Sequence, residues 1–214
     1  MKKISLVLAT AITLFVFPFQ NFAQSSSDTE NKLSLGFKVG ANLSNVYDTQ
    51  GDQFQADPRF GLAGGAFLSI PITTYIGIQP ELLFSQRGFQ GSGSILGSTY
   101  SYSKTSNYID VPILIALKVS QNLSFLIGPQ YSYLISQKYV FNSAIINTQQ
   151  EDQFNNENIR KNTLCITGGA DFSFDRLVLG ARIGLDVLNN NGDGTNDTPR
   201  YKNMWYQATI GYRF

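Results

Sequence analysis

The sequence predicts an all-β fold: a closed, eight-stranded, antiparallel up-and-down transmembrane β-barrel that follows a cleaved N-terminal signal peptide. Three observations predict it. Apolar residues recur at every second position in eight stretches, the connections between these stretches alternate between short and long, and only 14% of the 214 residues are charged. An average soluble domain carries roughly 25% charged residues. A period of two is typical of β-strands whose two faces meet different surroundings.

The last stretch, residues 204–214, shows the pattern most clearly. Its even positions are all apolar or aromatic and its odd positions are mostly polar, over about the length of a tilted membrane-spanning strand. A chain that ends in such a strand must pair both strand edges, which a barrel achieves by closing the last strand onto the first. We expect Tyr212 and Phe214 to end this C-terminal strand and to contact the barrel assembly machinery during insertion.

Seven further stretches alternate in the same way, and they precede the last one at residues 33–43, 60–70, 76–84, 109–117, 123–133, 164–172 and 177–187. Three connections are short (71–74, 120–122 and 174–176), and four are long and polar (47–58, 88–107, 137–162 and 189–203). Short periplasmic turns and long extracellular loops are typical of outer-membrane barrels. We expect bulges or weak spots in strand pairing at Pro80, Pro112 and Pro129, because proline cannot donate to the ladder.

The composition of the two strand faces predicts which face meets lipid. One face lacks charged residues, whereas the other is rich in glycine and holds seven charges, which we expect to form a polar network in the barrel interior: Lys38, Glu81, Asp110, Asp171, Arg182, Asp186 and Arg213. Small residues suit the crowded interior of an eight-stranded barrel. The alternative is a soluble, lipocalin-like barrel with the apolar face turned inward.

The N-terminus predicts export. Residues 1–23 have two lysines, an apolar run and a short polar segment, as in a secretory signal peptide. Residues 24–32 are expected to be a periplasmic tether and residues 33–214 the barrel, in the outer membrane of a Gram-negative cell. Cys165 is the single cysteine, so no intramolecular disulfide can form.

Little in the sequence indicates catalysis or a cofactor. The chain has no histidine, which removes nucleophile–histidine arrangements and imidazole metal sites. Cys165 is interpreted as a small core residue. Residues 189–197 resemble a calcium loop in their Asn, Asp and Gly residues, but Arg200 stands where a bidentate glutamate is needed, so a turn is favoured. A net charge of +1 gives no footprint for nucleic acid.

Three segments resemble a known family: residues 78–88 (IQPELLFSQRG), 108–114 (YIDVPIL) and 128–130 (GPQ). Together they are similar to the PorT-like outer-membrane β-barrel family of Bacteroidetes, over nearly the whole mature chain. The resemblance implies an eight-stranded barrel in the outer membrane and a link to protein secretion through the founding member. It implies no catalytic or ligand residues.

The expected function is therefore a structural or interaction role in the outer membrane, without catalysis, in association with protein secretion. Outer-membrane lipid is one expected partner. A protein partner at the extracellular loops is another, because the long segments 88–107 and 137–162 place tyrosine and phenylalanine among serine and asparagine, as contact surfaces do. The alternatives are the soluble ligand carrier and a narrow channel.

Overall fold

The computed structural model describes residues 32–47, 56–95, 98–143, 147–152, 160–190 and 201–214. The chain divides into two units, Met1–Lys32 and Leu33–Phe214, and the second unit contains every described strand. The expected signal peptide lies outside the described residues, as does the tether apart from Lys32. No helix in the described part of the chain is long and apolar enough to span a membrane.

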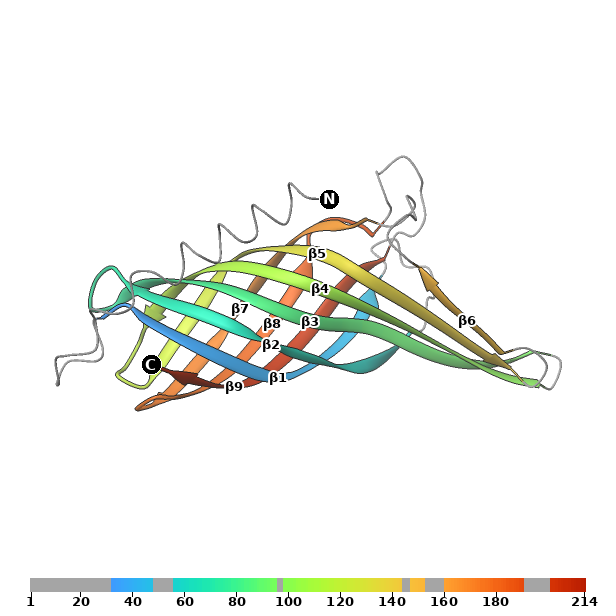
Figure 1. Ribbon diagram of the computed structural model, residues 1–214, viewed down its shortest axis with the longest axis horizontal. Coiled ribbons are helices and arrows are strands. Elements are labelled where there is room, and N and C mark those ends of the chain that lie inside the picture. Colours follow the sequence, from blue (N-terminus) through green and yellow to red (C-terminus); the bar gives the residue numbers. More distant parts are fainter. Residues whose placement is uncertain (1–31, 48–55, 96–97, 144–146, 153–159, 191–200) are drawn as a thin grey trace, which may run out of the picture. The chain divides into compact units, whose positions relative to one another are not determined.

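The described residues form nine strands in one antiparallel sheet, and eight of these strands close into a ring (Figure 1). The strands are β1 (Ser34–Tyr47), β2 (Asp57–Pro71), β3 (Ile76–Ile95), β4 (Ser98–Lys118), β5 (Leu123–Ser143), β6 (Asn147–Asp152), β7 (Asn162–Phe174), β8 (Leu177–Asp186) and β9 (Lys202–Arg213). The last strand, β9, pairs with β1 from Gly36–Arg213 to Tyr47–Lys202. The predicted closed, eight-stranded antiparallel barrel is thereby confirmed.

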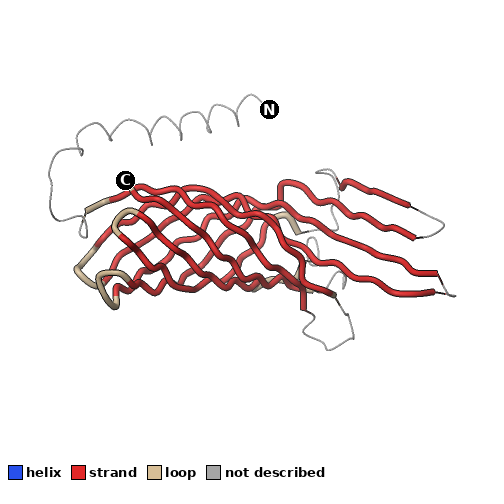
Figure 2. The backbone as a smooth tube through the Cα atoms, turned by 90° about the horizontal axis from the view of Figure 1, so that it is seen from below, coloured by secondary structure: helices blue, strands red, loops and turns tan. Residues whose placement is uncertain are grey.

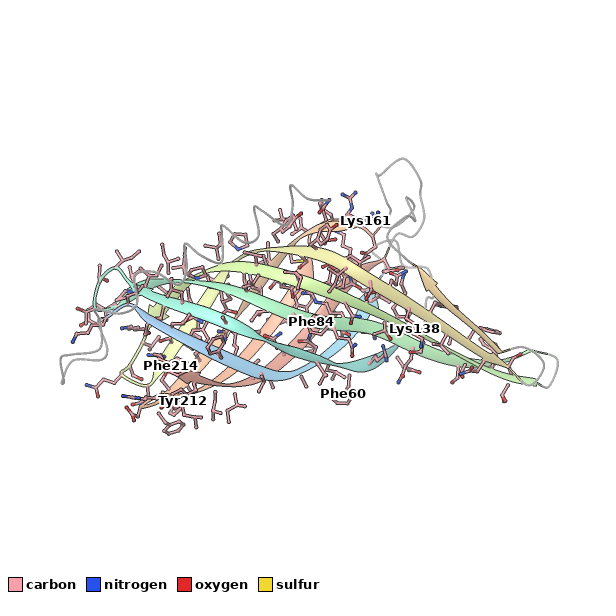
Figure 3. All side chains as sticks on the ribbon, in the orientation of Figure 1. Phe60, Phe84, Lys138, Lys161, Tyr212 and Phe214 are labelled. Carbon is pink, nitrogen blue, oxygen red and sulfur yellow. The ribbon has the colours of Figure 1, made fainter. Side chains whose placement is uncertain are left out.

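The outer face of the ring is apolar and exposed. Val39 is 62% exposed, Leu62 67% and Ile113 54%, although each is a large hydrophobic residue in the middle of a strand. Figure 3 shows Phe60 and Tyr212 pointing away from the barrel. Because such a surface is stable only against lipid, the inverted, soluble arrangement is wrong for this chain.

The three short connections form tight turns at one end of the ring. The amides of Ile72 and Thr73 both donate to the Ile76 carbonyl at 2.9 Å. In the two-residue turn between β7 and β8, Asp175 has φ 53°. Aspartate tolerates this left-handed conformation, which matches the twist of a two-residue hairpin. These turns hold the strand registers at that end.

At the other end of the ring, three strands continue as an open sheet. β4 and β5 are each 21 residues long, whereas β8 has 10 residues and β9 has 12. Figure 2 shows the long strands extending past the ring, and β6 adds to the edge of β5 there. The prediction that residues 88–107 and 137–162 are long loops is therefore wrong for their described parts. Most of these residues belong to β3, β4, β5 and β6. We call this extension, residues 88–95, 98–107, 137–143 and 147–152, the protruding sheet.

The three prolines weaken pairing locally without a bulge. Between β3 and β4 the pairs skip from Pro80–Ile113 to Leu83–Asp110, and between β4 and β5 they skip from Pro112–Gln130 to Ile115–Ile127. The register after each gap is unchanged. The register shifts lie elsewhere, between Pro58 and Ala63 and between Asn107 and Tyr108, near the place where the ring gives way to the protruding sheet. Bulges at barrel rims commonly redirect strands in this way.

Candidate functional site

Charged side chains of several strands meet in the barrel interior. Every second residue of a strand points inward, and the charged residues occupy these inward positions. Six of the seven predicted charges are buried: Lys38, Glu81, Asp110, Asp171, Arg182 and Asp186. Arg213 is half-buried near the short-turn end, where its Nη2 donates to Ser173 Oγ at 2.9 Å. Glycines opposite long side chains leave room for them, as in the pairs Lys38–Gly211 and Gly169–Arg182.

Four of the buried charges form one connected network, which we call the four-charge network: Lys38 from β1, Glu81 from β3, Asp171 from β7 and Arg182 from β8. Lys38 Nζ lies 2.5 Å from Glu81 Oε2, and Arg182 Nη1 lies 2.7 Å from Asp171 Oδ1. Arg182 Nη2 also lies 3.8 Å from Glu81 Oε1. Gln79 Nε2 bridges the two acids, donating to Glu81 at 2.9 Å and to Asp171 at 3.2 Å. Two acids and two bases thus neutralise each other across the interior.

A second group surrounds Arg87, a residue that the alternating stretches did not include. Arg87 forms an ion pair with Asp110, and both side chains are almost fully buried. The guanidinium carbon lies 3.5 Å from the centroid of the Trp205 ring and 4.8 Å from that of Tyr108. A Cβ atom at Gly184 would overlap the indole of Trp205, so only glycine lets this ring lie against the barrel wall. Arg87 therefore sits between two aromatic faces, a favourable place for a desolvated cation.

Asp186 ties the interior to the chain segments at the long-strand end. Its carboxylate accepts hydrogen bonds from Cys165 Sγ at 3.1 Å, from the Asn203 backbone amide at 3.1 Å and from Asn190 Nδ2 at 3.4 Å. Asn190 Nδ2 also donates to the Tyr201 carbonyl at 3.2 Å. Cys165 is buried and hydrogen-bonded, as expected of a core residue. Residues 191–197 of the calcium-like loop lie outside the described residues.

The interior has the composition of a packed core. Of the four buried acids, Glu81, Asp110 and Asp171 form ion pairs with Lys38, Arg87 and Arg182, whereas the Asp186 carboxylate is held by hydrogen bonds from uncharged groups. Between the charged groups, Leu114, Ala116 and Leu126 form a small apolar cluster. In the described ranges, no group of three or more histidine, cysteine, aspartate or glutamate side chains is placed to hold a metal ion.

The protruding sheet presents aromatic rings on the face that continues the barrel interior. Tyr100 stacks on Phe141 with ring centroids 5.8 Å apart, and Phe89 meets Tyr102 edge to face at 6.3 Å. Tyr201, just before β9, packs on Phe89 at 5.5 Å. Tyr139, on the same face, is 36% exposed. This face therefore carries ring surface among serine and glycine.

Lys104 and Tyr201 lie together where the protruding sheet meets the ring. Lys104 Nζ donates a hydrogen bond to the Tyr201 hydroxyl and lies 6.0 Å from the centroid of the Phe89 ring. Burial raises the pKa of Tyr201 well above its ordinary value, because the phenolate would be desolvated. The hydroxyl of Tyr201 thus stays protonated and accepts the hydrogen bond from Lys104 Nζ.

Tyr212 and Phe214 lie at the short-turn end with their side chains outward. The Phe214 amide donates to the Leu35 carbonyl at 2.8 Å, which anchors the chain end to β1. Its ring meets those of Tyr212 and Phe37 edge to face, with centroids 5.3 Å and 6.0 Å apart. The three rings form an exposed aromatic group at this rim, the depth at which such rings favour a membrane interface.

Comparison with known proteins gives one family match. Residues 22–191 match the family described as outer membrane protein beta-barrel domain. Ail, the attachment invasion locus protein of Yersinia pestis, is similar in structure (TM-score 0.49, 16% identity, covering 85% of this chain and 98% of Ail). Neisserial surface protein A gives a TM-score of 0.48 at 8% identity, covering 86% of this chain and 100% of that chain. No curated protein sequence matches.

Proposed function

The chain belongs to the outer membrane protein beta-barrel domain family, and from this premise we propose that it is a membrane-anchored interaction protein without catalytic activity. It is a small β-barrel of the outer membrane. In this proposal the filled ring is the anchor, and the protruding sheet faces outward from the cell, where it contacts a protein partner.

The protruding sheet is the observation that carries the proposal. A strand of about ten residues crosses a membrane, yet β4 and β5 have 21 residues each. At roughly 3.3 Å per residue, ten additional residues extend about 30 Å beyond the ring. An ordered sheet of that length serves no purpose in anchoring. It is rich in tyrosine, serine and glycine, the residue types that are enriched in the binding loops of antibodies.

The interior supports this function over a narrow channel. A channel needs a continuous polar path, whereas here Leu114 is completely buried and the charges of the four-charge network are paired with one another. Eight strands leave an interior that side chains fill. Purified protein in planar bilayers should therefore show no stepwise conductance, and steady single-channel currents would favour the channel instead.

The finer part of the proposal concerns the partner and assembly. The segments 78–88, 108–114 and 128–130, similar to the PorT-like family of Bacteroidetes, support a partner within a protein-secretion machine. The outward Tyr212 and Phe214 suit contact with the barrel assembly machinery. Residues 1–23 suit a signal peptide that directs export.

Photo-crosslinking in native outer membranes tests the proposal. A photoreactive amino acid at Tyr139, in the protruding sheet, should give a discrete protein adduct. The matched control is Ile127, which lies on the same strand, is 56% exposed and faces lipid. We expect no protein adduct from Ile127. Equal labelling from both positions, or none from either, would contradict an interaction role for the protruding sheet.

A further inference from the structure

Among the described residues, the β3 edge of the protruding sheet has no partner strand along part of its length. β2 pairs with β3 only as far as Asp57–Gln90, whereas β3 continues to Ile95 alongside β4. Among the described residues no strand pairs with the other side of β3 after Gln90. In an antiparallel strand the amides and carbonyls of alternate residues point to opposite sides. About half of the main-chain groups in Gly91–Ser94 therefore point to a side with no described partner strand.

The open edge lacks the features that normally prevent a strand from pairing. Natural edge strands are protected by charged side chains, proline or bulges. Residues 91–94 read Gly-Ser-Gly-Ser, without charge or proline, and their pairing with β4 runs without a register shift. By contrast, β6, at the opposite edge of the same sheet, contains Glu151 and Asp152. Within the described part of the protruding sheet, residues 91–94 at the β3 edge therefore lack the charges that the sequence of β6 carries.

Two tyrosines from the neighbouring strand cover this edge on one face. Tyr102 and Tyr100 of β4 reach across to the two glycines, so that a Cβ atom at Gly91 would lie 2.5 Å from the Tyr102 hydroxyl and one at Gly93 would lie 2.6 Å from the Tyr100 hydroxyl. The glycines therefore let the rings lie flat over β3 with their hydroxyls near the open side. A strand placed beside β3 would meet main-chain hydrogen-bonding groups in the sheet plane and phenol groups above it.

We infer that residues Gly91–Ser94 accept an extended segment of the partner protein as an added β-strand. Main-chain hydrogen bonds supply the attraction in this mode of recognition, and alternate side chains of the segment supply selectivity. Here the residues on one face of the segment would contact Tyr100 and Tyr102. The inference rests on the proposed function, because it specifies how the protruding sheet holds a protein partner.

Hydrogen exchange with a selected peptide tests strand addition. The full chain, folded in lipid nanodiscs, is used to select from a phage-displayed library of linear ten-residue peptides, and the selected peptide is then synthesised. We expect it to slow exchange at alternate amides of Gly91–Ser94 by about tenfold or more, with little change at the amides between them, which already face β4. Protection without this alternation, or a library with no peptide that protects this edge, would overturn the inference.

A pair of variants separates the edge from the face of the sheet. Ser92→Lys with Ser94→Lys adds charge to the open strand, whereas Ser101→Lys with Thr99→Lys adds the same charge to their cross-strand partners on β4. All four side chains are exposed. We expect the first variant to weaken peptide binding at least fivefold and the second to leave it within twofold. Equal weakening by both would place the contact on the sheet face and overturn strand addition.

The remaining outcomes separate this inference from the proposed function. Dimeric protein with an edge already protected in the absence of peptide would identify a second copy as the occupant and overturn the assignment to another protein. Tyr139 could give an adduct in native membranes that is lost in the β4 double-lysine variant but kept in the β3 one. The protruding sheet would then bind its partner through a face, so that strand addition fails and the proposed function stands. If Tyr139 gives no adduct, the proposed function itself fails.

Discussion

The ring and the protruding sheet share β3, β4 and β5, but the side chains that these strands turn outward differ between the two regions. Within the ring, β4 turns Val111, Ile113 and Ile115 outward, each more than one third exposed. Further along the same strand, the positions on that outward face are serine, threonine and asparagine, and the opposite face carries Tyr100, Tyr102 and Lys104. Strand pairing continues through this change. The difference teaches that backbone pairing sets the strand, whereas the solvent around it sets the side-chain pattern.

The transition between the two regions is also marked in the backbone. The register shift between β4 and β5 falls between Asn107 and Tyr108, and the shift between β2 and β3 falls after Pro58. On the short-turn side of these shifts every strand pairs with two neighbours. On the long-strand side the described strands form an open sheet. A substitution in the ring should therefore change the free energy of global unfolding, whereas one in the protruding sheet should change only local opening. Three predictions test this contrast.

The largest effect is expected inside the ring, at the pair Lys38–Glu81. Glu81→Gln leaves the buried Lys38 ammonium without its acid at 2.5 Å, and loss of one partner of a buried pair costs about 3–5 kcal/mol. Urea unfolding in phospholipid vesicles measures the loss. The double variant Lys38→Met with Glu81→Gln should recover most of it, because no unpaired charge remains. A double variant as unstable as the single one would argue against this explanation.

An intermediate effect is expected on the outer face of the ring. Ile113→Arg places a charge in the middle of the lipid-facing band, which costs about 2–4 kcal/mol near the bilayer midplane. Val140→Arg, on the corresponding face of β5 within the protruding sheet, should change the free energy of unfolding by no more than about 0.5 kcal/mol. Folded yield and urea unfolding in vesicles compare the two. If both positions tolerate arginine equally, the boundary between membrane and protruding sheet is misplaced.

The smallest effect is expected in the protruding sheet. Tyr100→Ala removes the ring stacked on Phe141, an interaction of about 0.5–1.5 kcal/mol. Because the sheet lies outside the closed ring, amides near Tyr100 should exchange several-fold faster while global unfolding stays unchanged. Hydrogen exchange and urea unfolding measure the two separately. A shift of the global transition would show that the two regions unfold as one unit.

The fold of the ring could be predicted because each of its strands carries its own signal. Alternation at period two located all eight ring strands, and the uncharged face predicted which side meets lipid. Arg87 follows the same parity as Glu81, and extending the third stretch past Phe84 would have identified it. It was missed because apolar residues, and not parity, defined the end of the stretch.

The protruding sheet and the pairing details were not predictable in the same way. Outside the membrane both faces of β3, β4 and β5 meet water, so the apolar alternation stops although the strand does not. The prolines showed where pairing weakens, but whether Pro80 causes a bulge or a gap depends on the neighbouring strand. The contacts of Arg87 with Trp205 and Asp110 join residues far apart in sequence, which no local pattern reveals.

Trp205 has a practical consequence for following assembly. It is the sole indole of the chain and lies on β9, the strand that closes the ring against β1, with its ring against Gly184 and Arg87. Its environment is complete only when β9 has joined both of its neighbours. Trp205 fluorescence should therefore report the final insertion step without a label. Its emission should shift to the blue when β9 pairs with both neighbouring strands.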